Sequence, residues 1–311
     1  MKTVLVTGAG GFIGTAMCES LSKNAYSVRA VTRTDKTKFP DGVVNYRQEL
    51  TLSNGLDDLC NGIDTIVHLA GRAHVQKEGE KRALDVFRKI NCAASLSLAE
   101  AAVRMGVRRF VYISSIGVIG NETFDEAFDE NTVPRPKTDY AISKYEAERM
   151  LTKQLAHTST ELVVIRPPLV YGSNAPGNFK RLTKLVELGL PLPFANANNK
   201  RSLVSLENLV SFITLCINHP AAGGETFLVS DGTEVSTKEI VLALSRGRKK
   251  LRPMIMLPKI GLKLAAKLFQ KDALYTQLFC DLQINSSKAR SLLNWKPNID
   301  TITQLEVVGR R

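Results

Sequence analysis

A glycine-rich turn between a strand and a helix constrains the fold of this chain more than any other feature. Residues 2–6 form a β-branched and apolar run typical of a buried strand, and apolar periodicity from about 12 to 23 predicts a helix. Between them, Gly8, Gly11 and Gly14 have the spacing of turns that hold a dinucleotide pyrophosphate. A glycine triplet also occurs in ordinary strand-to-helix turns. Its position between a good strand and a good helix favours the dinucleotide site.

Strands and helices alternate through the first half of the chain. Further strands are predicted at 27–32, 43–46, 64–69, 109–115, 162–166 and 226–230. The alternation predicts an α/β fold with a doubly wound parallel sheet of the Rossmann type. Ligands of such sheets bind beyond the carboxyl ends of the strands. We therefore expect one crevice lined by the residues at the strand ends, namely Gly8, Arg33, Gly71, Ser115 and Pro167.

The pattern changes at about residue 167 and predicts a smaller, discontinuous C-terminal substrate-binding domain. A loop at 173–178 precedes expected helices at 179–188, 203–217, 236–244 and 258–270. We predict a Rossmann domain of residues 1–166 plus about 203–230. The substrate-binding domain then comprises residues 167–202 and 231–311.

Composition limits the partners. Hydrophobic content of 44% and charged content of 23% are typical of a soluble globular protein, and the chain begins directly with a strand, so we expect no signal peptide or transmembrane segment. Five scattered cysteines without a CxxC pair predict free thiols in a reducing compartment, hence a cytoplasmic protein with no metal site. The net charge of +12 favours anionic small ligands, because motifs for nucleic-acid binding are absent.

One basic segment suggests a second interpretation of the net charge, namely that the protein lies close to a membrane. Lysines recur every four residues from 259 to 271 beside an apolar stripe of Ile260, Leu264 and Leu268. A basic amphipathic helix can lie on a membrane surface. We favour a surface helix whose apolar face packs on its own domain.

The end of the second predicted strand indicates the cofactor. In this fold an acidic residue there binds the ribose 2′-hydroxyl of NAD, whereas arginine accommodates the 2′-phosphate of NADP. The position holds Arg33, followed by Lys36 and Lys38. A solvated basic loop would look the same, but the position favours NADP(H), with NAD(H) possible. Beyond the third strand, Glu49 is a candidate contact to the adenine amino group.

Tyr140 and Lys144 supply the predicted chemistry. Their i, i+4 spacing places both side chains on one helix face. A nearby ammonium favours the phenolate, so we expect Lys144 to lower the pKa of Tyr140 and allow proton exchange with a substrate oxygen. Ser115 is expected to bond the same oxygen, with Ser114 the weaker candidate. His68, at the end of a buried strand, is expected to be structural.

These motifs together resemble the extended short-chain dehydrogenases/reductases that act on nucleotide sugars as epimerases, dehydratases and reductases. The resemblance spans essentially the whole chain and rests on the glycine turn, His68–Gly71, Asn91, Ser114–Ser115, Tyr140–Lys144, Arg166–Pro167 and the Ser287–Trp295 ending. In UDP-galactose 4-epimerases of this family the catalytic serine lies 25 residues before the tyrosine, which selects Ser115.

The resemblance implies three sets of site residues. The catalytic set is Ser115, Tyr140 and Lys144. The cofactor contacts are Gly8, Gly11, Phe12, Ile13, Gly14, Arg33, Glu49, Leu50, Leu69, Ala70, Gly71, Asn91, Ser114, Tyr140, Lys144 and Pro167. The UDP-sugar contacts are Ser115, Asn178, Pro193, Phe194 and Arg201.

Within the family, the catalytic residues do not separate reductases from epimerases. A dehydratase is disfavoured because Ile116–Val118 occupies the positions of its Asp-Glu pair. Arg33 favours a reductase using NADPH, most similar to 4-reductases of UDP-4-keto-6-deoxy-N-acetylhexosamines in O-antigen synthesis. The alternative is a UDP-glucose or UDP-N-acetylglucosamine 4-epimerase with retained NAD. A non-catalytic dinucleotide sensor is the weakest reading, because Tyr140 and Lys144 are both kept. Helices near 84–104 and 140–156 would suit a homodimer.

Overall fold

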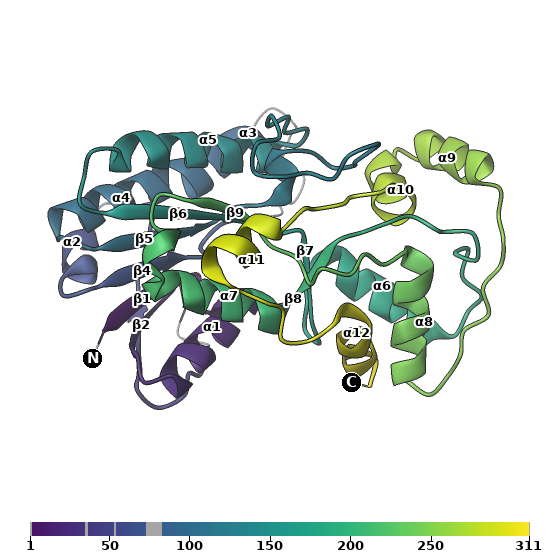
Figure 1. The fold of residues 1–311 in the computed structure, drawn as a ribbon, viewed down its shortest axis with the longest axis horizontal. Coiled ribbons are helices and arrows are strands. Elements are labelled where there is room, and N and C mark those ends of the chain that lie inside the picture. Colours follow the sequence, from purple (N-terminus) through teal and green to yellow (C-terminus); the bar gives the residue numbers. More distant parts are fainter. Residues whose placement is uncertain (1, 35–36, 53, 73–82, 311) are drawn as a thin grey trace.

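A seven-stranded parallel sheet forms the centre of the computed structural model, which describes residues 2–34, 37–52, 54–72 and 83–310 (Figure 1). Its strands are β1 (Thr3–Thr7), β2 (Ser27–Thr32), β3 (Val43–Arg47), β4 (Thr65–His68), β5 (Arg109–Ile113), β6 (Glu161–Arg166) and β9 (Thr226–Leu228). The order is β3-β2-β1-β4-β5-β6-β9, with every pair parallel. The order reverses direction at β1 and β4, where such sheets form their ligand crevice. The predicted doubly wound sheet is confirmed.

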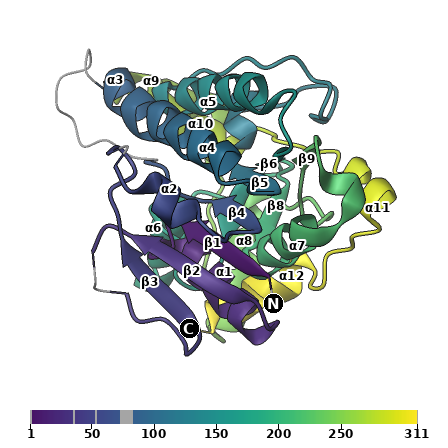
Figure 2. The same ribbon diagram turned by 90° about the vertical axis from the view of Figure 1, so that its left-hand side faces the viewer.

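Helices cover both faces of this sheet (Figure 2). α1 (Phe12–Lys23) and α7 (Leu206–Asn218) share one apolar core with the sheet. α2 (Leu56–Cys60), α4 (Ala94–Arg104) and α5 (Asp139–Leu155) share the core on the opposite face. The central strands β1, β4, β5 and β6 are mostly buried, which explains why they read as largely apolar runs, whereas the edge strand β3 is mostly exposed.

A smaller part of the chain lies beyond the carboxyl edge of the sheet. It contains α6 (Gly177–Leu188), α8 (Thr237–Gly247), α9 (Lys259–Leu268), α10 (Asp272–Phe279), α12 (Thr301–Gly309) and a two-stranded sheet of β7 (Leu169–Tyr171) and β8 (Leu203–Ser205). It has its own apolar core, to which α6, α8 and α12 contribute. The helix α11 (Ser287–Leu293) instead packs with the large sheet, where Trp295 lies 5.0 Å from the ring of Phe212.

Some predicted elements differ from those observed. The expected helix 82–105 consists, over its described part, of α3 (Ala83–Phe87), a π-helical segment (Arg88–Ala93) and α4. The expected helix 203–217 begins with β8, and α2, β7, α10 and α12 were not predicted. Elements of three to nine residues carry too few apolar positions to define a period.

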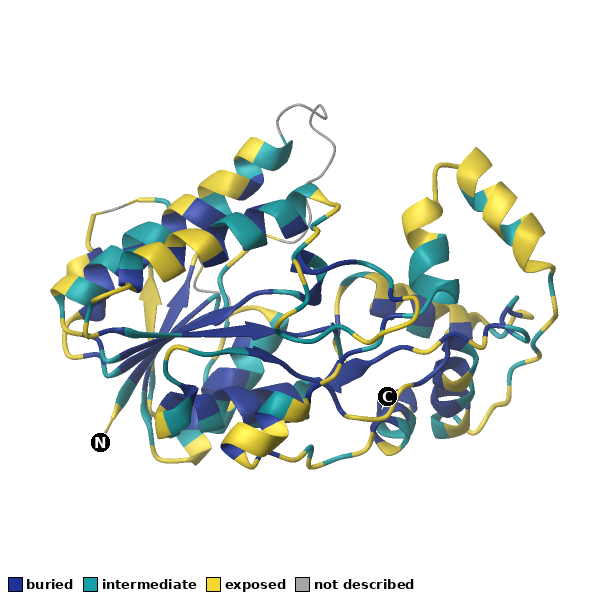
Figure 3. Cartoon of the chain, turned by 45° about the horizontal axis from the view of Figure 1, so that its top comes forward, coloured by how far each residue is buried: buried dark blue, intermediate teal, exposed yellow. Residues whose placement is uncertain are grey.

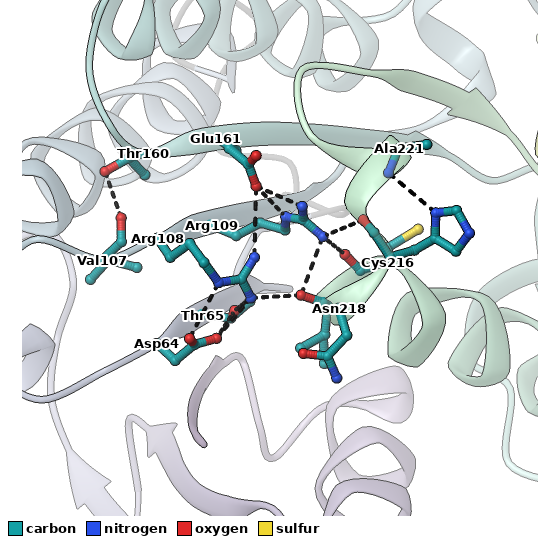
Figure 4. A network of polar contacts seen from close by, with 12 residues as sticks. Asp64, Thr65, Val107, Arg108, Arg109, Thr160, Glu161, Cys216, Asn218 and Ala221 are labelled. Carbon is teal, nitrogen blue, oxygen red and sulfur yellow. Dashed lines mark hydrogen bonds and ion pairs between the residues drawn. The ribbon is translucent and has the colours of Figure 1, made fainter. Parts of the chain in front are cut away.

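Two arginines at the start of β5 fasten α7 to the sheet (Figure 4). The buried Arg109 donates to the carbonyl oxygens of Cys216 and His219 at 2.7 and 2.9 Å and to Glu161 at 2.6 Å. Arg108 donates to Asp64 and to the carbonyl oxygen of Ile217, each at 2.8 Å. These guanidinium groups satisfy carbonyls at the C-terminal end of α7 that have no partner within the helix.

The described residues contain no helix long and apolar enough to cross a membrane. All five cysteines are free, as expected, and four of them are buried.

Candidate active site

The glycine turn lets β1, the turn after β4 and the start of α1 approach one another closely. Gly8 has a φ of +66°, and a Cβ there would lie 2.8 Å from the amide nitrogen of Ala70. A Cβ at Gly14 would lie 2.2 Å from the carbonyl oxygen of Gly8, so only glycine lets α1 start this close to the strand. No side chain caps the start of α1 at Phe12, which leaves the amides of its first turn available to an anion. This geometry fits a dinucleotide pyrophosphate.

Asn91 holds the second turn of the crevice. Its Oδ1 accepts from the amide of Arg72 at 2.8 Å, and its Nδ2 donates to the Arg72 carbonyl oxygen and to Ser143 Oγ at 3.2 and 3.0 Å. A Cβ at Gly71 would lie 3.3 Å from Asn91 Oδ1, so Leu69–Gly71 passes closely over this side chain. Asn91 is buried and its amide is occupied by these bonds, so it positions the turn rather than offering a free group to a cofactor. The π-helical segment places it there.

Ser114 and Ser115 follow the end of β5. Ser115 Oγ accepts from the amide of Gly117 at 3.1 Å, and a Cβ at Gly117 would lie within 3.5 Å of both Ser115 Oγ and Ala141 Cβ. Ser115 is therefore beside the first turn of α5, which contains Tyr140. The buried Ser114 Oγ has no hydrogen-bond partner among the described residues, which leaves a hydroxyl available to a ligand.

Lys144 is buried next to the same strand end. Its Nζ lies 4.1 Å from the centroid of the Tyr112 ring, a cation–π distance, and 3.9 Å from where a Cβ of Gly71 would be. Burial lowers the pKa of Lys144 to about 8, partly offset by the Glu148 carboxylate. Tyr112 was not singled out from the sequence. Its position in a strand whose residues are all buried gives it the signature of an ordinary core residue.

The expected lowering of the Tyr140 pKa is wrong for this structure. Part of the residue is exposed, yet burial raises the pKa of Tyr140 to about 12. The Lys144 amine sits over the Tyr112 ring and makes no hydrogen bond to the Tyr140 hydroxyl among the described residues. Desolvation of the phenolate therefore outweighs attraction to the ammonium, and Tyr140 is protonated at neutral pH.

Two buried groups of polar side chains lie next to this site. His68 bonds Thr7 Oγ1 and Ser95 Oγ, each at 2.7 Å, and burial lowers its pKa to about 3. The histidine is therefore neutral and structural, as predicted. One turn beyond Lys144, the Glu148 carboxylate accepts from Arg166 at 3.0 and 2.7 Å with both side chains buried. This pair ties α5 to the end of β6 just before Pro167.

The adenosine side of the crevice is open. Arg33 and Glu49 are exposed, and Leu50 is buried. Arg33 has no hydrogen-bond or ionic partner among the described residues, so a cofactor phosphate would meet a free guanidinium. Lys36, named with Arg33 in the sequence, lies outside the described residues.

The residues expected to contact the substrate lie in the smaller part of the chain. Arg201 is buried, and its guanidinium has one hydrogen bond, to the carbonyl oxygen of Cys280 at 3.1 Å, with no carboxylate partner among the described residues. Burial lowers its pKa to about 10. Such an unpaired buried cation fits an anionic ligand. The exposed Asn178 bonds Gln277, and Pro193 is half-buried. The Phe194 ring is buried against Phe279, so only its edge or backbone can approach a base.

The fold and the site together define a nicotinamide-dinucleotide enzyme with a tyrosine–lysine pair at its catalytic strand end. Residues 4–230 match the model of the NAD dependent epimerase/dehydratase family. The chain is 39% identical over 299 residues to a protein of Vibrio cholerae named UDP-glucose 4-epimerase, covering 95% of this chain and 91% of the relative. The chain therefore belongs to the NAD-dependent epimerase/dehydratase family.

More distant relatives share the full length. A protein of Escherichia coli O157:H7 named N-acetyl-alpha-D-glucosaminyl-diphospho-ditrans,octacis-undecaprenol 4-epimerase is 24% identical and is covered to 88%, against 93% of this chain. The structure of UDP-glucose 4-epimerase with UDP-glucose from Thermotoga maritima superposes with a TM-score of 0.80 at 21% identity, over 99% of this chain and 97% of that one. That likeness confirms the fold.

Proposed function

We propose that this protein is a UDP-sugar 4-epimerase that removes a hydride from C4 of a hexose and returns it to the opposite face. The observation that supports it is the placement of Ser115, Tyr140 and Lys144 at the end of β5 beside the glycine turn, in a chain 39% identical to a protein named UDP-glucose 4-epimerase. The sequence alone favoured a reductase. The relatives' names favour the epimerase, which was the alternative.

In this proposal each residue has one task. Tyr140 moves the proton on the sugar O4, Ser115 bonds that oxygen, and Lys144 supplies positive charge beneath the site. When bound, the nicotinamide accepts and returns the hydride, and the positive charge of its oxidised ring favours the ionised form of a nearby phenol. The amides that begin α1 would hold the pyrophosphate, with Ser114 Oγ a further donor. Arg201 would pair with the UDP diphosphate, because it is buried and has no carboxylate partner among the described residues.

The test measures whether the redox state of the nicotinamide changes as the sugar is converted. Purified protein, supplied with NAD only if none is bound, should interconvert UDP-glucose and UDP-galactose, or their N-acetyl forms, with no net change in absorbance at the nicotinamide band. Consumption of one reduced cofactor per sugar would contradict the epimerase.

A second candidate is a UDP-4-keto-sugar reductase, favoured by the unpartnered Arg33 at the end of β2. It predicts stoichiometric loss of NADPH with a 4-keto-6-deoxy UDP-sugar. The discriminating variant is Arg33→Asp, which should reverse a preference for NADPH over NADH. Equal affinities in the unmodified protein would remove the support for this candidate.

We also propose that the enzyme works in the cytoplasm as a homodimer paired through α4 and α5. Its free cysteines and the adjacent packing of these two helices support that arrangement. Sedimentation velocity of the purified protein tests it, and a monomer at micromolar concentration would contradict it.

A further inference from the structure

The helix α9 exposes an apolar stripe that the other described residues do not cover. Ile260, Leu264 and Leu268 are 76, 63 and 78% exposed. No residue of α9 is buried, and most of the helix has the exposed colour in Figure 3. The expected packing of this face on its own domain is therefore wrong. Half-buried Leu262 and Ala266 form the side of α9 that meets the body of the protein.

The apolar surface continues past both ends of the helix. Met256, three residues before the helix, is 73% exposed, and Phe269, directly after it, is 69% exposed. Large side chains clustered in this way on one projecting segment differ from the single exposed apolar residues of ordinary surfaces. The segment therefore has the form of a docking surface.

The charge of α9 indicates what kind of partner this docking surface would bind. Lys259, Lys263 and Lys267 are exposed, and their i, i+4 spacing on α9 places them in a row next to the apolar stripe, while the exposed Lys271 lies just beyond the end of the helix. From 259 to 272 the only acidic residue is Asp272. A second copy joined through this face by two-fold symmetry would bring two lysine rows together, which opposes that contact. A surface that presents negative charge above an apolar layer matches both the lysine row and the apolar stripe.

We propose that α9 is an interfacial helix that binds the surface of an anionic phospholipid bilayer. Ile260, Leu264 and Leu268 enter the boundary between headgroups and acyl chains, while the lysine row contacts lipid phosphates. The helix lies in the smaller part of the chain, beside α10 and far from β1 and β2 (Figure 1). Docking through α9 would therefore hold the enzyme at the membrane by its substrate-binding part.

The experiment is co-sedimentation of the full-length protein with phosphatidylcholine vesicles, with and without phosphatidylglycerol. We expect binding to the phosphatidylglycerol vesicles only, and a decrease of binding with added salt. The variant Leu264→Ser/Leu268→Ser should lose about tenfold or more of the partition coefficient, because two interfacial anchors are removed. Lys263→Gln/Lys267→Gln should also weaken binding, most visibly at low salt.

Two controls separate this from other roles. Leu52→Ser removes an equally exposed leucine, 60% exposed, far along the chain from α9, and should leave binding unchanged. Turnover of a soluble UDP-sugar should be the same in the α9 variants as in the unmodified protein, so failure of the proposed reaction and failure of membrane binding are distinguishable. Absence of vesicle binding would overturn the proposal, as would equal binding to neutral vesicles. A raised KM in the serine variants would assign the stripe to a substrate lid. A dimer that they dissociate would assign it to a second copy.

Discussion

At the scale of single residues, the site joins one group that is hard to ionise with one that is hard to protonate. Burial raises the pKa of Tyr140 to about 12 and lowers that of Lys144 to about 8. At neutral pH Tyr140 is therefore neutral, while Lys144 remains mainly charged, and in the proposed mechanism a bound oxidised nicotinamide would add the charge that favours the phenolate.

Removing the Tyr140 hydroxyl should stop proton transfer while preserving the fold. Tyr140→Phe is expected to lower kcat by about 10²-fold or more, and Ser115→Ala by less. Ser114→Ala should leave the free energy of unfolding unchanged, because its hydroxyl has no partner among the described residues, but should weaken cofactor binding. Steady-state kinetics, urea unfolding and fluorescence titration with nicotinamide cofactor check the three variants. Near-normal turnover of Tyr140→Phe would mean that another group moves the proton.

The burial of Lys144 should show as a stability cost that depends on pH. Its pKa is about 8 in the fold and about 10.5 when exposed, so the unfolded chain holds the proton more tightly between these values. The cost is full below about pH 8 and disappears as the pH rises toward 10.5. Lys144→Met should therefore be inactive but more stable at pH 7 by about 1–3 kcal/mol, with the difference vanishing above about pH 10.5.

The matched control is Lys153→Met on the same helix, where the lysine is exposed. Urea unfolding across this pH range compares the two variants with the unmodified protein. A constant difference at every pH would show that packing, not protonation, sets the effect.

The positions of residues in a turn or at a strand end could be predicted from the sequence, while their roles stay predictions. The glycines, Ser115, Tyr140 and Lys144 lie where expected. The contact of Tyr112 with Lys144 could not be predicted from the sequence, because it joins a ring on β5 to an amine on α5. The Tyr140 pKa was misjudged because desolvation depends on surroundings that a spacing does not describe.

At the scale of elements, long periodic segments were predictable and short ones were not. The parallel strands and α1, α5 and α6 follow their apolar patterns. The strands β7 and β8 have three residues each, and their pairing rather than their composition defines them. The π-helical segment around Asn91 could not be predicted from the apolar periodicity, because its extra residue widens only a single helical turn. Such segments are frequent at functional sites.

The attachment of α7 to β5 is the element-scale feature with the clearest energetic consequence. Arg109→Ala should lower the free energy of unfolding by about 2–4 kcal/mol, because it strips a buried donor from the carbonyls of Cys216 and His219. Arg104→Ala, which breaks an ion pair to Asp57 with both side chains about half exposed, should cost much less. Urea unfolding of both variants measures the contrast. Equal costs would mean that the Figure 4 network adds nothing beyond surface charge.

At the scale of the whole molecule, the expected site residues come from two parts of the chain. The sheet supplies the glycine turn, Ser115 and α5, and the smaller part supplies Arg201 and Asn178. The chain crosses between them repeatedly, through β7, β8 and the segment before α11. The predicted division at about residue 167 follows the change in pattern, but the packing of Trp295 against Phe212 could not be read from the sequence.

The net charge of +12 should speed the capture of anionic substrate. A UDP-sugar carries two phosphate charges, and a positive protein raises the encounter rate with such a ligand. Salt screens this attraction, since the Debye length falls from about 30 Å at 0.01 M to about 10 Å at 0.1 M. We therefore expect kcat/KM for the UDP-sugar to fall about two- to tenfold from low ionic strength to about 0.5 M salt, with kcat nearly constant. If the nicotinamide stays bound through each cycle, as the epimerase requires, the salt effect should appear in the KM of the UDP-sugar alone. A sucrose series at constant salt separates viscosity from screening, and a kcat/KM that does not change with salt would show that the surface charge takes no part in capture.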